Sequence, residues 1–153
     1  MTRAAASRLR RETGQPMNEP RDATADAVTP SVAVVLCTSG AGRLAACLGA
    51  LLAQRCDPAC WEIVVVDFAD DGEARRVVHA LAPSGGAPRL DYVAAERGAG
   101  DRVDAARRAA ARIVHAGRIV VIDDDARPEP GWLLQEAAMA PAAAPGAGVA
   151  AAR

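Results

Sequence analysis

Short aliphatic runs, each the length of one strand, recur along this 153-residue chain and limit its fold more than any other feature. They are rich in valine and isoleucine, and glycine or polar residues follow them. Continuous apolar runs of this kind are typical of strands buried on both faces of a parallel sheet. The first run is expected to end in a polar turn over 37–40. The predicted strands cover 31–36, 62–66, 90–93 and 118–122.

The stretches between these runs repeat apolar residues at three- and four-residue steps, which is the spacing of one helical face. Leu44, Leu48 and Leu51 show this spacing after the first run. Strands that alternate with helices predict right-handed crossovers and an α/β fold, with a mainly parallel sheet and helices on both faces. The expected helices run to Gln54, over 72–81, from Asp101 to Gly117, and from near Trp132.

Charge and composition argue against several classes of partner. Eighteen basic and nineteen acidic residues give a net charge of −1, and only 3% of residues are aromatic, so nucleic acid is not an expected partner. No apolar run approaches the roughly 18 residues of a membrane span, and the first residues lack the apolar stretch of a signal peptide. We expect a cytoplasmic protein without a transmembrane segment, and peripheral membrane association stays open.

The chain divides into a tail and one domain. Residues 1–30 are polar, charged and interrupted by proline, which predicts a disordered tail, and 31–153 form the domain. The four cysteines are expected to be ordinary buried thiols, because Cys56 and Cys60 lack zinc-knuckle spacing and no histidine stands near them in sequence. The last stretch, 141–153, leads into another strand or is a frayed end.

Three consecutive aspartates, Asp123, Asp124 and Asp125, directly follow the fourth predicted strand. Like charges this close repel one another unless a cation or hydrogen-bond donors compensate. Mg²⁺ and Mn²⁺ prefer oxygen ligands and commonly bind one or two carboxylates together with substrate phosphates. A solvated acidic loop that caps the next helix is the alternative. The preceding strand, and Asp67 at the same edge of the sheet, favour a metal and phosphate site.

The segment VIDDDARPEPGWL, at 121–133, looks like the strand, DxD-type motif and turn of inverting glycosyltransferases with the GT-A fold. The nearest match is the large family that includes cellulose and chitin synthases. SVAVVLCTSGAGRLAACLGALLAQ, at 31–54, resembles that family's first strand and helix, and EIVVVDFADD, at 62–71, resembles its second strand. The likeness runs from residue 31 to the end, and implies a GT-A or Rossmann-like nucleotide-binding half-domain.

This resemblance implies a nucleotide-diphosphate sugar as the donor. Thr38 and Asp67 would line the nucleoside pocket, and Asp124 would approach the ribose. The family often carries a second aspartate after its second strand, where this chain has Phe68. The base, the sugar and the acceptor are therefore not specified.

The same resemblance implies Mn²⁺ or Mg²⁺ as the cofactor. Asp125, with Asp123 assisting, would face the metal and the diphosphate. Arg107 would lie near the phosphates, where such enzymes often carry an Ala-Arg-Asn element. The sequence ends at Arg153, before the region in which the family places its catalytic aspartate, so no catalytic residue is identifiable and we expect a truncated domain.

Two other interpretations stay open. Residues 40–45 match the GxGxxA pattern of NAD(P)-binding Rossmann domains, in which Asp67 would bind the ribose. Asp67, however, lies further past Gly40 than the about 20 residues typical of that fold, and the triple aspartate would have no function. The other interpretation is a noncatalytic remnant of the glycosyltransferase fold.

Overall fold

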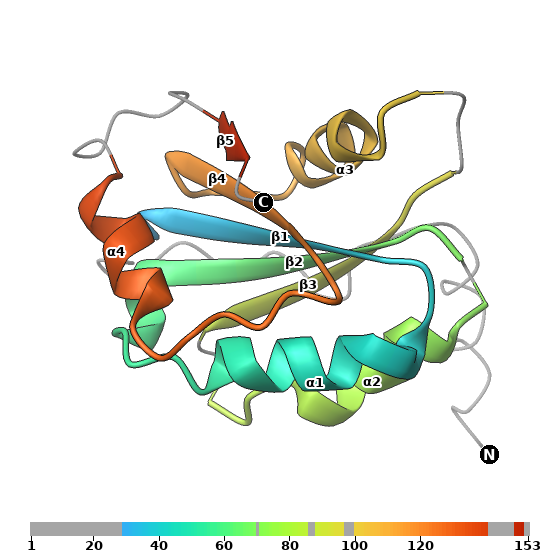
Figure 1. Ribbon diagram of the computed structural model, residues 1–153, viewed down its shortest axis with the longest axis horizontal. Helices are drawn as coiled ribbons and strands as arrows, with labels where there is room; N and C mark the ends of the chain where they lie inside the picture. The colour runs from blue at the N-terminus through green and yellow to red at the C-terminus, as the bar shows by residue number, and fades with distance from the viewer. Residues whose placement is uncertain (1–28, 70, 86–87, 97–99, 141–148, 152–153) are drawn as a thin grey trace, which may run out of the picture.

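The computed structural model of the chain describes residues 29–69, 71–85, 88–96, 100–140 and 149–151 (Figure 1). Almost all of the tail predicted for 1–30 lies outside this part of the chain. Among the described residues, every helix is too short or too polar to span a membrane.

A five-stranded sheet in which all neighbouring strands are parallel forms the centre of the domain. The strand order is β3-β2-β1-β4-β5, so β1 lies in the middle, and all of its residues are buried. The strands are β1 (Val32–Thr38), β2 (Trp61–Asp67), β3 (Arg89–Ala94), β4 (Arg118–Asp123) and β5 (Val149–Ala151). The structure thereby confirms the predicted parallel α/β fold, and the last stretch of the chain contributes a strand.

Helices cover both faces of this sheet (Figure 1). One face packs against α1 (Ala41–Leu52), α2 (Glu73–Leu81) and α4 (Trp132–Ala138), and the other against α3 (Arg102–Ala110). A single turn of 3₁₀ helix, η1 (Pro58–Cys60), precedes β2. Successive side chains of a strand point to opposite faces, so in β1 Val34 joins the core beneath α1 and Val35 joins the core beneath α3. Burial on both faces explains the unbroken aliphatic runs.

The third predicted helix ends earlier than its apolar spacing indicated. It was expected to continue to Gly117, but α3 ends at Ala110. The backbone N–H groups of His115 and Ala116 donate to Glu62 Oε1, at 2.6 and 2.7 Å, instead of to carbonyls one helical turn back. Glu62 is fully buried in β2, and the turn after α3 supplies the donors that its carboxylate needs.

The strands bring the predicted site residues to one edge of the sheet. β1 continues through Thr38, so the polar turn expected over 37–40 begins two residues later. In the pairing register Thr38 lies beside Asp67, and Cys37 lies beside Asp123. This edge holds the carboxyl ends of all three strands, where parallel α/β proteins bind ligands.

Candidate functional site

Asp124, the middle aspartate of the triplet, is buried and bonded to the protein. Its side chain lies on the α1 side of the sheet, and the residue is only 7% exposed. Thr38 Oγ1 lies 2.8 Å from Asp124 Oδ2, within hydrogen-bond distance, and Arg43 Nε donates to Oδ1 at 3.2 Å. Both carboxylate oxygens therefore have protein partners, and Asp124 connects β1, the first turn of α1 and the end of β4.

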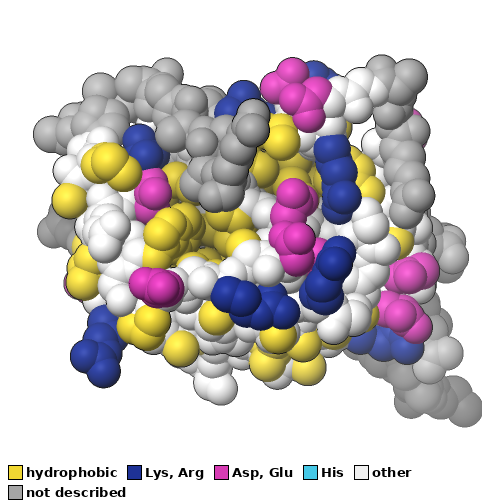
Figure 2. All heavy atoms as spheres, in the orientation of Figure 1, with side chains coloured by type: hydrophobic (Ala, Val, Ile, Leu, Met, Phe, Trp, Pro, Cys, Tyr) yellow, Lys and Arg dark blue, Asp and Glu magenta, His cyan; other side chains and the backbone are white. Residues whose placement is uncertain are grey.

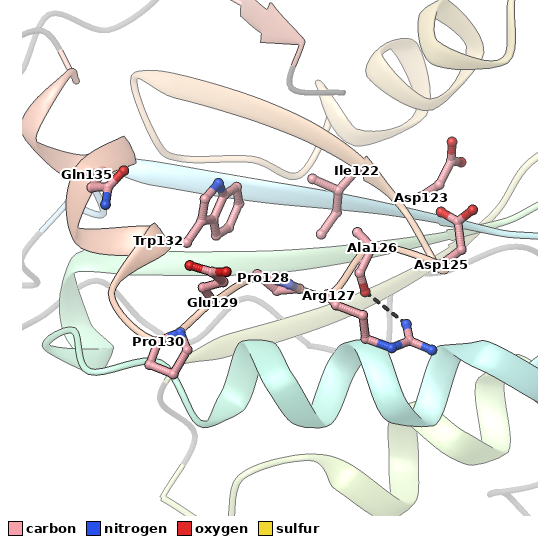
Figure 3. Close-up of a pocket in the computed structure, with 10 residues that line it drawn as sticks. All are labelled: Ile122, Asp123, Asp125, Ala126, Arg127, Pro128, Glu129, Pro130, Trp132 and Gln135. Atoms are coloured by element: carbon pink, nitrogen blue, oxygen red, sulfur yellow. Dashed lines mark hydrogen bonds between the residues drawn. The ribbon is translucent and has the colours of Figure 1, made fainter.

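Asp123 and Asp125, the flanking aspartates, are exposed. Both line an open cavity of about 460 Å³ between the end of β4 and the start of α4 (Figure 3). Glu129, Arg127 and Trp132 line the same cavity. On the face shown in Figure 2, an apolar hollow lies among acidic and basic side chains. Of the triplet, only the flanking aspartates thus line this cavity.

The donor set of this cavity suits a divalent cation that also binds a phosphorylated ligand. Three carboxylates and one guanidinium line it, so its wall carries an excess of two negative charges. Carboxylate oxygens are the ligands that Mg²⁺ and Mn²⁺ prefer. Within the described part of the chain, no group of three or more His, Cys, Asp or Glu side chains could hold a metal. Ligand oxygens would therefore have to complete the coordination.

Asp67 lies at the same edge but is fully buried and does not line the cavity. Its Oδ1 accepts from the Ala69 N–H at 2.9 Å, and its Oδ2 accepts from the Tyr92 hydroxyl at 2.8 Å. The guanidinium of Arg75 lies over the Tyr92 ring, 5.1 Å from its centroid. Asp67 thus connects β2 to β3, and its contact with a nucleoside stays a prediction.

Arg107 lies on α3, on the opposite face of the sheet from α1. Its Nη1 donates to Asp104 Oδ1 at 3.5 Å, and it does not line the cavity. The structure therefore does not bring Arg107 into contact with Asp123 or Asp125, and its place near phosphates stays a prediction.

Gln54 is a site residue that the sequence analysis did not single out. It was expected to end the first helix, but α1 ends at Leu52. The Gln54 amide nitrogen donates to the carbonyl of Glu129 at 3.0 Å, and its amide oxygen accepts from the N–H of Leu133 at 3.1 Å. It thereby fixes the turn that walls the cavity. These contacts join positions 75 and 79 residues apart, so no local pattern indicates them.

The sequence analysis also did not single out Arg43 and Arg127 as site residues. Arg43 binds Asp124, as described above, and its side chain is 65% exposed. Arg127 follows Asp125 by two residues within the motif-bearing segment, and this position was the available signal. Positive charges near an acidic cluster at a strand end reduce the repulsion between its carboxylates.

The cysteines near this edge are neutral thiols. Burial, followed by the charge of Asp123, raises the pKa of Cys37 to about 12. Burial raises the pKa of Cys47 to about 11. Cys37 and Cys47 are buried, as the sequence predicted, whereas Cys56 and Cys60 are half-buried. Because a metal binds the thiolate rather than the thiol, Cys37 and Cys47 are unsuited to metal binding.

The fold and the acidic edge define an α/β domain with an acidic cavity at the carboxyl ends of its strands. Residues 31–152 match the family model of glycosyl transferase family 2. The match covers most of the chain, and the chain belongs to this family. No curated protein matches the sequence significantly. Family membership favours glycosyl transfer over dinucleotide binding, and the cellulose and chitin synthase branch stays a prediction.

Proposed function

We propose that this domain binds a nucleoside diphosphate sugar with Mn²⁺ or Mg²⁺, as the donor site of a glycosyltransferase. The observation that carries the proposal is the exposure of Asp123 and Asp125 in one cavity at the carboxyl edge of the sheet. Membership in glycosyl transferase family 2 supports a sugar nucleotide as the ligand.

Asp123 and Asp125 would hold the metal, and diphosphate oxygens would complete its coordination. A bound divalent cation supplies charge stabilisation to the departing diphosphate. Asp124 contributes differently, because Thr38 and Arg43 bind its carboxylate and fix the turn on which the other two aspartates stand. On this proposal two aspartates of the triplet are ligands for the metal, and the third anchors the turn.

Thr38 and Asp67 would border the nucleoside, and Asp124 would accept from a ribose hydroxyl. Each carboxylate oxygen can accept more than one hydrogen bond, so a ribose contact does not require the loss of Thr38. Asp67 is buried, so it would position the nucleoside indirectly, by fixing the turn at Ala69 through its hydrogen bond to the Ala69 N–H. Arg107 would have to exchange its ion pair with Asp104 for a phosphate.

Transfer to an acceptor also needs a general base that removes the proton from the attacking hydroxyl. We assign that function to no described residue. The proposal for the described part of the chain is therefore limited to the binding of the donor and the orientation of its diphosphate.

Calorimetry with UDP, GDP and their sugars, with and without Mn²⁺ or Mg²⁺, tests this function. We expect metal-dependent binding, weakened about tenfold or more by Asp123→Asn and by Asp125→Asn, since each removes charge from the metal site. Glu73→Gln is the matched control, because Glu73 is an exposed carboxylate that does not line the cavity.

Two results would count against the proposal. One is a folded protein with no affinity for divalent ions or nucleoside diphosphates. The other is metal-independent binding of NAD(H) that Asp125→Ala leaves unchanged, which would favour the dinucleotide-binding interpretation of residues 40–45.

A further inference from the structure

Arg127 is the one cationic side chain among the described residues that line the cavity with Asp123 and Asp125. It is exposed, and its Nη1 donates to the carbonyl of Ala126 at 2.9 Å and lies 3.5 Å from the carbonyl of Asp124 (Figure 3). These contacts hold one corner of the guanidinium against the turn that carries the aspartates. Within the described part of the chain, its Nε and Nη2 groups have no hydrogen-bond partner.

A positively charged group such as the guanidinium of Arg127 is needed in the cavity when a diphosphate binds. Without Arg127 the three carboxylates of the wall would carry three negative charges, so one divalent cation would leave an excess of one, and a diphosphate brings further negative charge close to Glu129 and the aspartates. A second counter-charge is then needed at the same place. The guanidinium presents planar N–H donors that match phosphate oxygens in a two-point contact.

The other arginines near this edge are less suited to this function. Arg43 already donates through its Nε to Asp124, which needs that donor because it is buried. Arg107 pairs with Asp104 on α3 and does not line the cavity. Arg127 bonds only to backbone carbonyls, so a phosphate contact would cost no ion pair.

We infer that Arg127 is a diphosphate-binding residue, which contacts the phosphates of the donor on the side away from the metal. This inference rests on the proposed function and adds a phosphate contact to it. It assigns the phosphate-binding function to a residue on the β4–α4 turn, whereas the family resemblance indicated Arg107.

Calorimetry with inorganic diphosphate, UDP and GDP in the presence of Mn²⁺ tests this inference. We expect Arg127→Ala to weaken the binding of diphosphate, and of the nucleoside diphosphate that the wild type binds, roughly ten- to hundredfold, the range for a charge-assisted hydrogen bond. Arg127→Lys should lose less, because it keeps the charge without the planar fork. The corresponding nucleoside monophosphate should lose less affinity than the diphosphate.

Arg76→Ala is the control, and Arg107→Ala tests the competing assignment. Arg76 is exposed on α2, and its loss should leave every affinity unchanged. If the wild type binds a nucleoside diphosphate and Arg127→Ala binds it equally well, the inference is wrong and the proposed function stands. If Arg107→Ala weakens diphosphate binding and Arg127→Ala does not, the phosphate-binding residue is Arg107 on α3. If the wild type binds no nucleoside diphosphate, both proposals fail.

Discussion

At the scale of single residues, the aspartate triplet shows what a strand end does to identical side chains. Asp123, the last residue of β4, is exposed, whereas Asp124, the first residue of the turn after it, is buried. The sequence places the triplet at a strand end and predicts a cation site there. It does not reveal that Thr38 would supply the hydroxyl beside Asp124, because the two are 86 residues apart.

Replacement of Thr38 by valine tests the anchoring of Asp124. The shapes are similar, but Asp124 Oδ2 loses its hydroxyl partner while remaining buried, and the backbone of Gly40 loses the same hydroxyl. We expect the free energy of unfolding to fall by about 1–3 kcal/mol, as for a buried polar group left unpaired. Urea denaturation measures the change, with Ser39→Ala, at an exposed neighbouring position, as the control. A loss for Thr38→Val no larger than that of the control would show that Asp124 needs no hydroxyl partner.

At the scale of elements, periodicity predicted which segments form helices and strands better than where they end. Apolar residues continue at helical spacing past Ala110, yet α3 ends there. The N–H groups of Ile113 and Val114 still donate to the carbonyl of Ala110, whereas those of His115 and Ala116 donate to Glu62, a single buried carboxylate in β2. The apolar patterns of β2 and α3 do not predict this contact, because it depends on how the strand and the turn after the helix pack together.

Glu62→Met tests this account of the helix end. Methionine keeps much of the volume but leaves the N–H groups of His115 and Ala116 without their acceptor. A buried donor left without its acceptor costs roughly 1–3 kcal/mol. We expect unfolding at lower urea and faster hydrogen exchange at these two amides. Glu62→Gln retains one carbonyl acceptor and should lose less; equal losses in both variants would contradict the account.

At the scale of the whole molecule, the alternation of strands and helices predicted the parallel sheet, its two covered faces and its ligand-binding edge. The central position of β1 follows from crossovers to both sides of it. The sequence did not decide between β5 and a frayed end, because Val149–Ala151 is a short segment in an alanine-rich stretch. The cavity could not be predicted, since its wall depends on Gln54 and the turn before α4.

The molecule also has a second acidic cluster, at the amino ends of the strands. Asp91 Oδ2 lies 2.6 Å from Arg89 Nε, and Glu62 lies close to the same guanidinium. Burial raises the pKa of Asp91. These carboxylates are fully buried and already close to cationic or N–H groups, so we expect a divalent ion to prefer the exposed pair at the opposite edge.

The most direct test of the central claim is the position of a paramagnetic ion in the folded protein. Amide NMR spectra with the bound nucleoside diphosphate would be compared in Mg²⁺ and in Mn²⁺, which broadens the signals of nearby nuclei. We predict loss of the Asp123, Asp125 and Arg127 signals, with those of His115 and Ala116 retained. Broadening centred on Glu62 and Asp91, or spread evenly over the protein, would contradict the claim that Asp123 and Asp125 hold the metal.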